Sequence, residues 1–346
     1  MSAIGSIRIT IRTRDGEITG ADVQSARAID TARLFKGRGK SEAMALNRAL
    51  FGICPAAQSL ACELAFDAAL GKNPQNEELR GLEADNALET LRENLMLFGL
   101  RVPGTLKTEA RAPFVKAIQA LCAGSVSLGS DTLPSVLEPV RALLLGALPE
   151  GAQSLEAGFV PGSPWGDFFV SLENDPLKGK IEDSLILPKN HDIAENPNVL
   201  LQVRAFTGAL QRSASSPYFR KRLAKDGNTT FLRLAARFSE TLGLLASPEK
   251  INQGSAAVAT GCRQGAGIVQ TARGTLVHKA VLTPEGRLAD YEILSPTEIN
   301  FGDFSSLKKL LIGTKFKNED TLSGEISLLM ASFDPCLPYE VEINHA

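Results

Sequence analysis

A regular stripe of apolar side chains over residues 76–98 constrains the fold of this chain more than any other local pattern. Its members recur at helical spacing, at Leu79, Leu82, Leu88, Leu91, Leu95 and Phe98. This spacing predicts one long amphipathic helix, whose apolar face must be covered by other parts of the chain. The sequence therefore predicts a core that is built largely by packed helices.

Short strands are expected among further helices. Helical periodicity or capping residues predict helices from Ser41 onward, over 55–69, and at about 109–122, 133–146, 197–211, 216–225, 229–246, 303–312 and 320–331. Alternating or β-branched runs predict an opening hairpin, with a strand over 6–12 and a turn before Ile18, and later strands over 266–270, 275–282 and 288–294. These elements together predict a helix-rich α+β fold.

Residues 147–198 interrupt this periodicity. They are rich in proline, glycine and acidic residues, and they predict an irregular excursion on the surface or a weak domain boundary. With 346 residues, the chain is long enough for one large domain or for two ordinary ones.

The charge balance and the cysteine content limit the possible partners and compartments. The 37 Lys and Arg residues nearly balance 39 Asp and Glu residues, so we expect binding neither to nucleic acid nor to a membrane surface. No apolar run reaches the ~18 residues of a membrane span, and the first residues lack the pattern of a secretory signal. Five widely spread cysteines are no disulfide framework, and they predict the reducing cytoplasm.

Two of the five cysteines have a sequence context that favours chemistry over packing. Cys54 immediately precedes the proline that begins a predicted helix, where the helix dipole is expected to stabilise a thiolate. Cys336 lies between a proline turn and the end of the chain. The alternative for such residues is a buried small apolar role, which free cysteines commonly have. We expect this structural role for Cys62, Cys122 and Cys262.

Familiar kinds of cysteine site are incomplete in this chain. A zinc site needs four ligands at close spacing, and the sequence has no intact C-x-x-C pair. A nucleophilic cysteine needs a histidine base, and His191, His278 and His345 stand in no recognisable signature, so a contribution from any of them stays open. The glycine-rich residues 261–267 lack the order of a phosphate loop, and we expect a loop that leads into the next strand.

Five segments resemble the motifs of nickel–iron hydrogenase large subunits, in the same order along the chain. Residues 332–336, S-F-D-P-C, resemble the start of the C-terminal signature S-F-D-P-C-x-x-C-x-x-H, and residues 49–58 resemble the N-terminal R-x-C-G-x-C-x-x-x-H. Residues 272–278 are similar to A-P-R-G-x-x-x-H, 295–300 to P-T-x-W-N and 4–9 to E-G-H-L-R-I.

Because these matches extend from one end of the chain to the other, the resemblance implies a single large-subunit-like domain over residues 1–346, with the excursion at about 147–198. It further implies a central helix bundle with small β elements, in which the N- and C-terminal motifs meet at one buried site. We also expect the C-terminal tail to return to the core beside the helix over 55–69, with Arg273 nearby.

The departures from the family motifs bear directly on function. In the family, four thiolates from two C-x-x-C pairs hold nickel and iron. Cys54 matches a bridging cysteine and Cys336 a terminal nickel ligand, whereas Phe51 and Tyr339 stand at the other two positions. The glutamate of E-G-H, the proton gate of the family, is Ile4. The resemblance therefore implies a protein without nickel that is not an enzyme.

The residues that resemble the iron side of the family site are retained. In the family, an arginine and a Pro-Thr block surround the cyanide and carbonyl ligands of iron, and Arg273, Pro296 and Thr297 match them. An iron ion with three such ligands of its own can be held by two protein thiolates, Cys54 and Cys336. Soft thiolates suit a low-spin iron centre of this kind. The two motif histidines are replaced, by Gln58 and Glu342.

This combination is similar to hydrogenase assembly proteins of the HupK/HoxV type, which are large-subunit-like but lack half of the cysteines. The resemblance implies a cytoplasmic scaffold that holds iron with cyanide and carbonyl ligands before its transfer. Its partners would be hydrogenase maturation proteins and the hydrogenase large subunit. A second hypothesis is a metal-free mimic of the large subunit that binds the maturation machinery, and a third is a divergent active subunit.

Overall fold

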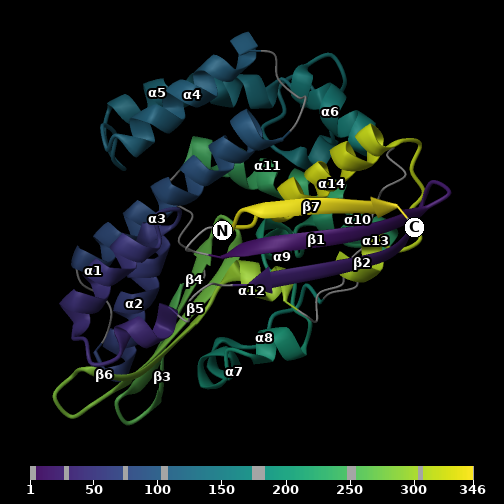
Figure 1. Ribbon diagram of the computed structural model, residues 1–346. Coiled ribbons are helices and arrows are strands. Elements are labelled where there is room, and N and C mark those ends of the chain that lie inside the picture. Colours follow the sequence, from purple (N-terminus) through teal and green to yellow (C-terminus); the bar gives the residue numbers. More distant parts are fainter. Residues whose placement is uncertain are drawn as a thin grey trace.

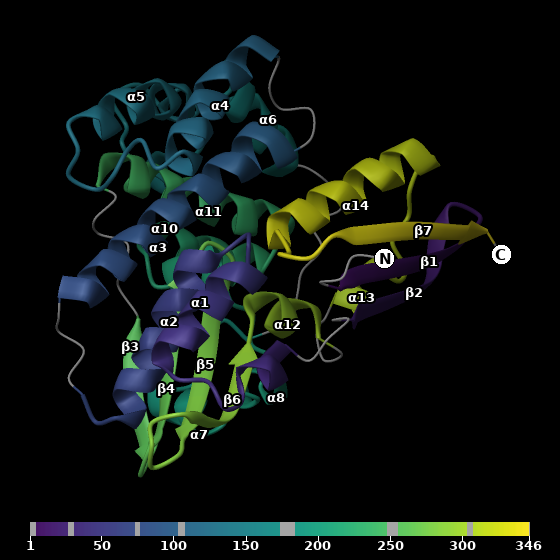
Figure 2. The same ribbon diagram turned by 60° about the vertical axis from the view of Figure 1, so that its left-hand side comes forward.

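Two small sheets flank a set of packed helices (Figures 1 and 2). The computed structural model describes residues 5–26, 31–72, 77–102, 108–173, 184–247, 255–302 and 307–345. One sheet has the strand order β2-β1-β7 and the other β3-β4-β5-β6. Both views place α3 and α11 between these sheets and the outer helices α4 to α6.

The three-stranded sheet joins the two ends of the chain. Strands β1 (Ser6–Arg14) and β2 (Glu17–Ala26) form the predicted hairpin, with both turn residues, Asp15 and Gly16, in the left-handed region. Strand β7 (Tyr339–His345) pairs in parallel with β1, so the yellow and purple ends of the ribbon lie side by side in Figure 1. The tail thus extends along β1 after Cys336, and its last residues do not enter the core beside α2.

The four-stranded sheet is a series of antiparallel hairpins. Its strands are β3 (Ala256–Gly261), β4 (Gln264–Thr271), β5 (Gly274–Leu282) and β6 (Leu288–Leu294). The last three confirm the predicted strands, whereas β3, which is made mostly of alanine and other small residues, was not predicted. The glycine-rich segment also differs from the expected loop, because its second half belongs to β4.

Helix α2 (Pro55–Ala69) lies directly on β4 because two glycines of that strand have no side chain. A Cβ atom built at Gly267 would lie 2.1 Å from the carbonyl oxygen of Ala61, and one built at Gly265 would lie 2.4 Å from the amide nitrogen of Ala69. All residues of α2 from Ala57 onward are buried. The helix has the predicted bounds and the predicted proline start.

The longer helices agree with the periodicity of the sequence within a few residues. They are α1 (Lys40–Leu50), α3 (Glu77–Met96), α4 (Thr108–Cys122), α5 (Thr132–Leu145), α10 (Pro217–Asp226), α11 (Thr230–Ala246) and α14 (Glu319–Phe333). The first of them begins one residue before the expected cap, after Gly39. Helix α3 continues into a single π-helical turn, Leu97–Arg101. No helix among the described residues is both long and apolar enough to cross a membrane.

The shorter helices differ more from the sequence-based expectations. They are η1 (Thr31–Phe35), η3 (Leu155–Ala157), α7 (Asn190–Glu195), α8 (Val199–Gln202), α9 (Ala209–Ser213), α12 (Pro296–Phe301) and α13 (Leu307–Leu311). The single helix predicted over 197–211 is divided into α8 and α9, because Arg204 and Gly208 both adopt positive φ. Helix α12 was not predicted, and the first residues of the helix predicted at 303–312 lie outside the described residues.

The expected excursion at 147–198 is less irregular than its composition suggested. It contains helix α6 (Pro164–Glu173), whose Trp165 and Phe169 are buried in the main core. The ring of Trp165 meets that of Phe98 edge-on, with centroids 5.2 Å apart. Residues 174–183 of this segment lie outside the described residues.

The close contact between α2 and β4 predicts how substitutions at glycine change the stability of the protein. We expect Gly267→Ala to lower the free energy of unfolding by roughly 1–3 kcal/mol, because its methyl group overlaps the backbone of α2. The matched control is Gly243→Ala on α11, where the position is open and the loss of glycine should stabilise the helix by roughly 0.5–1 kcal/mol. Urea unfolding followed by circular dichroism measures both. Equal midpoints for the two variants would contradict the close packing.

Candidate functional site

Cys54 occupies the cap position of helix α2. Its backbone φ of −132° is non-helical, and its carbonyl oxygen accepts the first helical hydrogen bond from the Gln58 amide, at 3.1 Å. The preceding residue, Ile53, is exposed, and its carbonyl oxygen accepts a hydrogen bond of 2.6 Å from Nη2 of Arg92. Cys54 as a whole residue is therefore half-buried, at the point where an exposed loop enters a buried helix.

Cys336 is held by the first turn of helix α12. Ser295 caps this helix in a capping box with Glu298, and Pro296 and Thr297 form its first turn and are buried. The Cys336 amide donates to the Thr297 hydroxyl oxygen at 3.2 Å, and the same hydroxyl lies 3.0 Å from the Cys336 sulfur. Since this oxygen already accepts from the amide, its own hydrogen is available to the sulfur.

The structure brings the two cysteines from opposite ends of the chain into one site. Burial, together with negative charge on Glu89 and Cys336, raises the pKa of the Cys54 thiol to about 12, against the opposing charge of Arg273. Cys336 in turn helps to raise the pKa of Arg273. Both sulfurs therefore lie within the electrostatic reach of one guanidinium group. The expectation that the N- and C-terminal motifs meet at one site, with Arg273 nearby, is confirmed.

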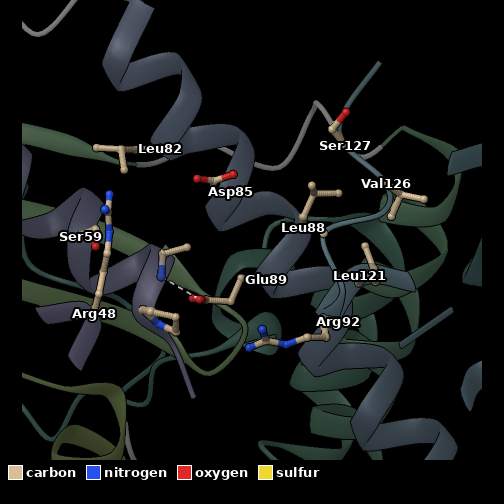
Figure 3. Close-up of a pocket in the computed structure, with 13 residues that line it drawn as sticks. Arg48, Ser59, Leu82, Asp85, Leu88, Glu89, Arg92, Leu121, Val126 and Ser127 are labelled. Carbon is tan, nitrogen blue, oxygen red and sulfur yellow. Dashed lines mark hydrogen bonds between the residues drawn. The ribbon is translucent and has the colours of Figure 1, made fainter. Parts of the chain in front are cut away.

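A carboxylate, rather than the Cys54 thiolate, satisfies the N-terminus of α2. Glu89 of α3 accepts hydrogen bonds from the Ala56 and Ala57 amides at 2.8 and 3.1 Å (Figure 3). It thereby takes the position in which an anion gains from the helix dipole. The expectation that this dipole lowers the pKa of Cys54 is wrong, because the thiol is buried and the first amides of the helix already donate to Glu89.

A cavity of about 450 Å³ adjoins this helix terminus and is lined in part by Pro55 and Ala56. Figure 3 shows Glu89 and Arg92 along one part of its wall and Arg48, Ser59 and Asp85 along another. Burial raises the pKa of Glu89 to about 7, although the two amide hydrogen bonds oppose this change. The Glu89 carboxyl group therefore titrates near neutral pH between the cavity and the start of α2.

Arg273 and two buried carboxylates form an ionic network behind the thiols. Nε of Arg273 donates to the carbonyl oxygen of Asp334 at 2.6 Å, and its Nη2 lies 2.7 Å from Glu93 and 3.3 Å from the Asp334 carboxylate. Arg101 joins both carboxylates, and Arg237 lies 3.3 Å from Asp334. Although burial opposes ionisation, the Arg273 charge and its neighbours keep the pKa values of Glu93 and Asp334 below their ordinary ranges.

This network has more positive than negative charge. Among the described residues, the guanidinium groups of Arg92, Arg101, Arg237 and Arg273 face the carboxylates of Glu93 and Asp334. Four cations against two anions leave two positive charges in surplus, and ionisation of Glu89 reduces the surplus to one. The surroundings of the two thiols therefore favour an anionic occupant.

The positions of the missing family cysteines do not supply replacement ligands. Phe51 packs against the core between α1 and α2, and Tyr339 is exposed at the start of β7. Glu342 is exposed on the same strand. Ile4, which stands at the position of the proton gate, lies outside the described residues.

The three histidines have different surroundings. His345 on β7 is exposed and pairs with Glu319 at 3.0 Å, and His191 on α7 is exposed and pairs with Glu195. His278 on β5 is fully buried and is connected to Cys54 through Gln58. Of the three, His278 is therefore the one that the structure links to the cysteine site.

The protein donors at this site do not form a closed metal cage. Among the residues that the structure describes, no group of three or more His, Cys, Asp or Glu side chains is arranged to hold a metal ion. The two thiols are soft donors, and Arg273 and Thr297 supply hydrogen-bond donors beside them. The arrangement can therefore hold a metal that brings other ligands, whereas it does not complete the four-ligand shell of a bare zinc ion.

Sequence reasoning missed the carboxylates of this site. Asp334 adjoins Pro335-Cys336 in a motif that the sequence analysis had singled out, and its left-handed backbone, with φ of 49°, ends α14. Its place in this motif, beside Pro335 and Cys336, was the sequence signal that could have identified Asp334 as a site residue. Glu89 and Glu93 lie on the buried face of α3, one turn apart, and acidic residues among the leucines of that stripe were the corresponding signal.

Comparison with known proteins gives relatives over nearly the whole chain. No family model matches the sequence. The chain is 27% identical to the hydrogenase expression/formation protein HupV of Azotobacter chroococcum, over 99% of both chains. It is also 27% identical to HupK of Rhizobium leguminosarum, over 99% of this chain and 97% of the relative, and to HoxV of Cupriavidus necator, over 95% and 94%. The predicted resemblance to proteins of this type is confirmed.

Solved structures with the same fold are hydrogenases. The nickel–iron–selenium hydrogenase of Desulfovibrio vulgaris Hildenborough matches with a TM-score of 0.57 at 15% identity, over 94% of both chains. The corresponding hydrogenase of Dm. baculatum matches with a TM-score of 0.58 at 14% identity, also over 94% of both chains. At this identity the likeness concerns the fold alone, and it confirms the expected hydrogenase large-subunit-like, helix-rich fold.

The raised pKa of Glu89 predicts a specific pH dependence of stability. Between its ordinary pKa of 4.5 and about 7, the folded state retains a proton that the unfolded state has released, so the free energy of unfolding falls as pH rises. At about 1.4 kcal/mol per pKa unit, this contribution reaches roughly 3 kcal/mol. Glu89→Gln should therefore flatten the dependence measured by urea unfolding at pH 5, 6, 7 and 8. Parallel curves for the two proteins would show that Glu89 does not titrate as expected.

Proposed function

We propose that this protein is a non-catalytic assembly scaffold in nickel–iron hydrogenase maturation. It holds an iron ion with cyanide and carbonyl ligands through Cys54 and Cys336, and passes this cargo to the hydrogenase large subunit. Maturation proteins that deliver the cargo are its further partners, in the cytoplasm. The likeness to hydrogenase expression/formation proteins over nearly the whole chain supports the maturation role.

The observation that carries the proposal is that, among the described residues, the thiols of Cys54 and Cys336 lie together beside a cationic network. Each thiolate adds one negative charge, and the network has two positive charges in surplus over Glu93 and Asp334, or one when Glu89 is ionised. A bare divalent cation between the thiols would be repelled by the arginines. In an iron fragment, the negative cyanide ligands offset the positive charge of the iron. The fragment and the two thiolates together therefore have a net negative charge, which matches the positive surroundings better than a bare cation does.

Residues beside the two thiols suit the cyanide and carbonyl ligands of such a fragment. Nε and Nη2 of Arg273 are fixed by Asp334 and Glu93, and Nη1 of the same guanidinium group is a further N–H donor. A cyanide nitrogen is an acceptor for this donor. Pro296 has no amide hydrogen, so it adds an apolar surface beside Thr297, which holds Cys336. Arg273, Pro296 and Thr297 are thus the cofactor-binding residues of the proposal.

The protonation of the Cys54 thiol favours reversible loading. With a pKa of about 12, Cys54 is protonated in the free protein at neutral pH. A metal binds the thiolate, so loading must release this proton, and the affinity for the cargo falls as the pH is lowered. A site with two protein ligands and a protonated resting state releases its cargo more easily than a closed four-thiolate site.

Infrared spectroscopy tests the proposal directly. Protein purified from cells that express the hydrogenase maturation machinery should show cyanide and carbonyl stretching bands, and Cys54→Ser or Cys336→Ser should abolish them, because serine removes a soft donor. Cys122→Ser and Cys262→Ser are matched controls, since these cysteines are exposed and their loss should leave the bands unchanged.

Other outcomes would favour the other hypotheses. Folded wild-type protein that repeatedly lacks both iron and infrared bands, yet binds maturation proteins, would identify a metal-free mimic of the large subunit. Hydrogen-dependent dye reduction after incubation with nickel would contradict the non-catalytic assignment. Bands that persist in both cysteine variants would show that the cargo is held elsewhere.

A further inference from the structure

A chain of hydrogen bonds extends from the Cys54 sulfur into the core. Nε2 of Gln58 lies 3.7 Å from the sulfur, and its Oε1 lies 2.7 Å from Nε2 of His278. Nδ1 of His278 lies 2.5 Å from the Tyr291 hydroxyl. These residues come from α2, β5 and β6, so the chain of hydrogen bonds connects the start of the helix, through β5, to the edge strand β6 of the four-stranded sheet.

The packing of α2 on the sheet makes this connection possible. His278 is paired across the strands with Gly267, which is the residue that lets α2 approach β4. Gln58 lies one turn before Ala61, whose carbonyl oxygen faces Gly267. The absence of a side chain at Gly267 therefore lets the Gln58 amide reach the imidazole.

The chemistry of the groups fixes the direction of the hydrogen bonds. The Gln58 carbonyl oxygen can only accept, so Nε2 of His278 must carry the imidazole hydrogen. A neutral imidazole has one N–H, and its Nδ1 then accepts from the Tyr291 hydroxyl. The remaining group of Gln58, its NH₂, faces Cys54 and donates to the sulfur. Every donor in the chain thus points towards Cys54.

Burial keeps each residue of this hydrogen-bond chain in the protonation state that the direction of the hydrogen bonds requires. His278 is 0% exposed, Gln58 3% and Tyr291 6%. Burial lowers the pKa of His278 to about 3, so the imidazole is neutral at physiological pH. Burial also raises the pKa of Tyr291 well above 10, so its hydroxyl always retains its hydrogen. The relay therefore has one direction across the physiological pH range.

We propose that Gln58, His278 and Tyr291 form a directional relay that presents an N–H group to the Cys54 sulfur and stabilises its thiolate form. Gln58 contacts the sulfur, whereas His278 and Tyr291 are positioning residues that act through it. This inference deepens the proposed function, on which it rests, because it identifies the hydrogen-bond donor that faces the sulfur of a proposed iron ligand. If the relay were reversed, Gln58 would offer its oxygen, which stabilises the protonated thiol instead.

The relay is tested by the rate at which iodoacetamide alkylates each cysteine of the purified, metal-free protein, measured by peptide mass spectrometry at several pH values. Gln58→Met removes the donor and should slow the alkylation of Cys54 by about tenfold, the effect of one pKa unit on the thiolate fraction. The exposed Cys122 and Cys262 are internal references whose rates should not change.

Paired variants distinguish the effect of hydrogen-bond direction in the relay from the effect of lost side-chain packing. His278→Leu removes the donor to Gln58 and should slow the alkylation of Cys54, whereas His278→Gln retains a donor there and should restore at least half of the wild-type rate. Tyr291→Phe should have a smaller effect in the same direction. Tyr218→Phe, at a tyrosine on α10 far along the chain from the relay, should have none.

The opposite result would overturn the relay. If Gln58 and His278 only filled space, their loss would loosen the start of α2, and Cys54 would become more accessible and react faster. An unchanged or faster rate in Gln58→Met and His278→Leu therefore contradicts the proposal. The measurement needs no iron, so its failure leaves the scaffold function standing, and a failure to find infrared bands leaves the relay standing.

Discussion

The interaction of Arg273 with Asp334 and Glu93 is the constraint on which the rest of the site depends. Arg273 lies in the turn between β4 and β5, Glu93 on α3, and Asp334 at the end of α14. One guanidinium group thus connects three parts of the chain that are far apart in sequence. Two residues after Asp334 comes Cys336, so the position of its thiol follows from this ion pair. A buried pair of this kind is costly to break, because the remaining charge would have no partner.

Local signals in the sequence were sufficient to predict much of the framework. The bounds of α2 followed from Pro55 and from the glycine after the helix, and the opening hairpin followed from alternating residues around an Asp-Gly turn. These predictions succeeded because the cause of each element lies within a few residues of it. The meeting of Cys54 and Cys336 followed instead from motif resemblance, since no local pattern contains a contact between residues 282 positions apart.

The features that sequence reasoning missed depend on distant partners. The effect of the helix dipole on Cys54 was misjudged because Glu89, which caps α2, comes from another helix. Helix α6 was missed because its stability comes from burying Trp165 against Phe98 rather than from a long periodic stripe. In the same way, the role of His278 is visible only when β5 is placed against α2. Tertiary contacts decided all three features.

The parallel pairing of β7 with β1 has a consequence for the order of events in the cell. During synthesis, the strand that begins at Ser6 emerges from the ribosome long before its partner strand, which begins at Tyr339. Until then β1 has an open edge, and contacts this distant in sequence form late in folding. Cys336 stands immediately before this last strand, so the nascent chain cannot complete the two-cysteine site. A ligand that needs both thiols can therefore bind only after β7 has been synthesised and has paired with β1.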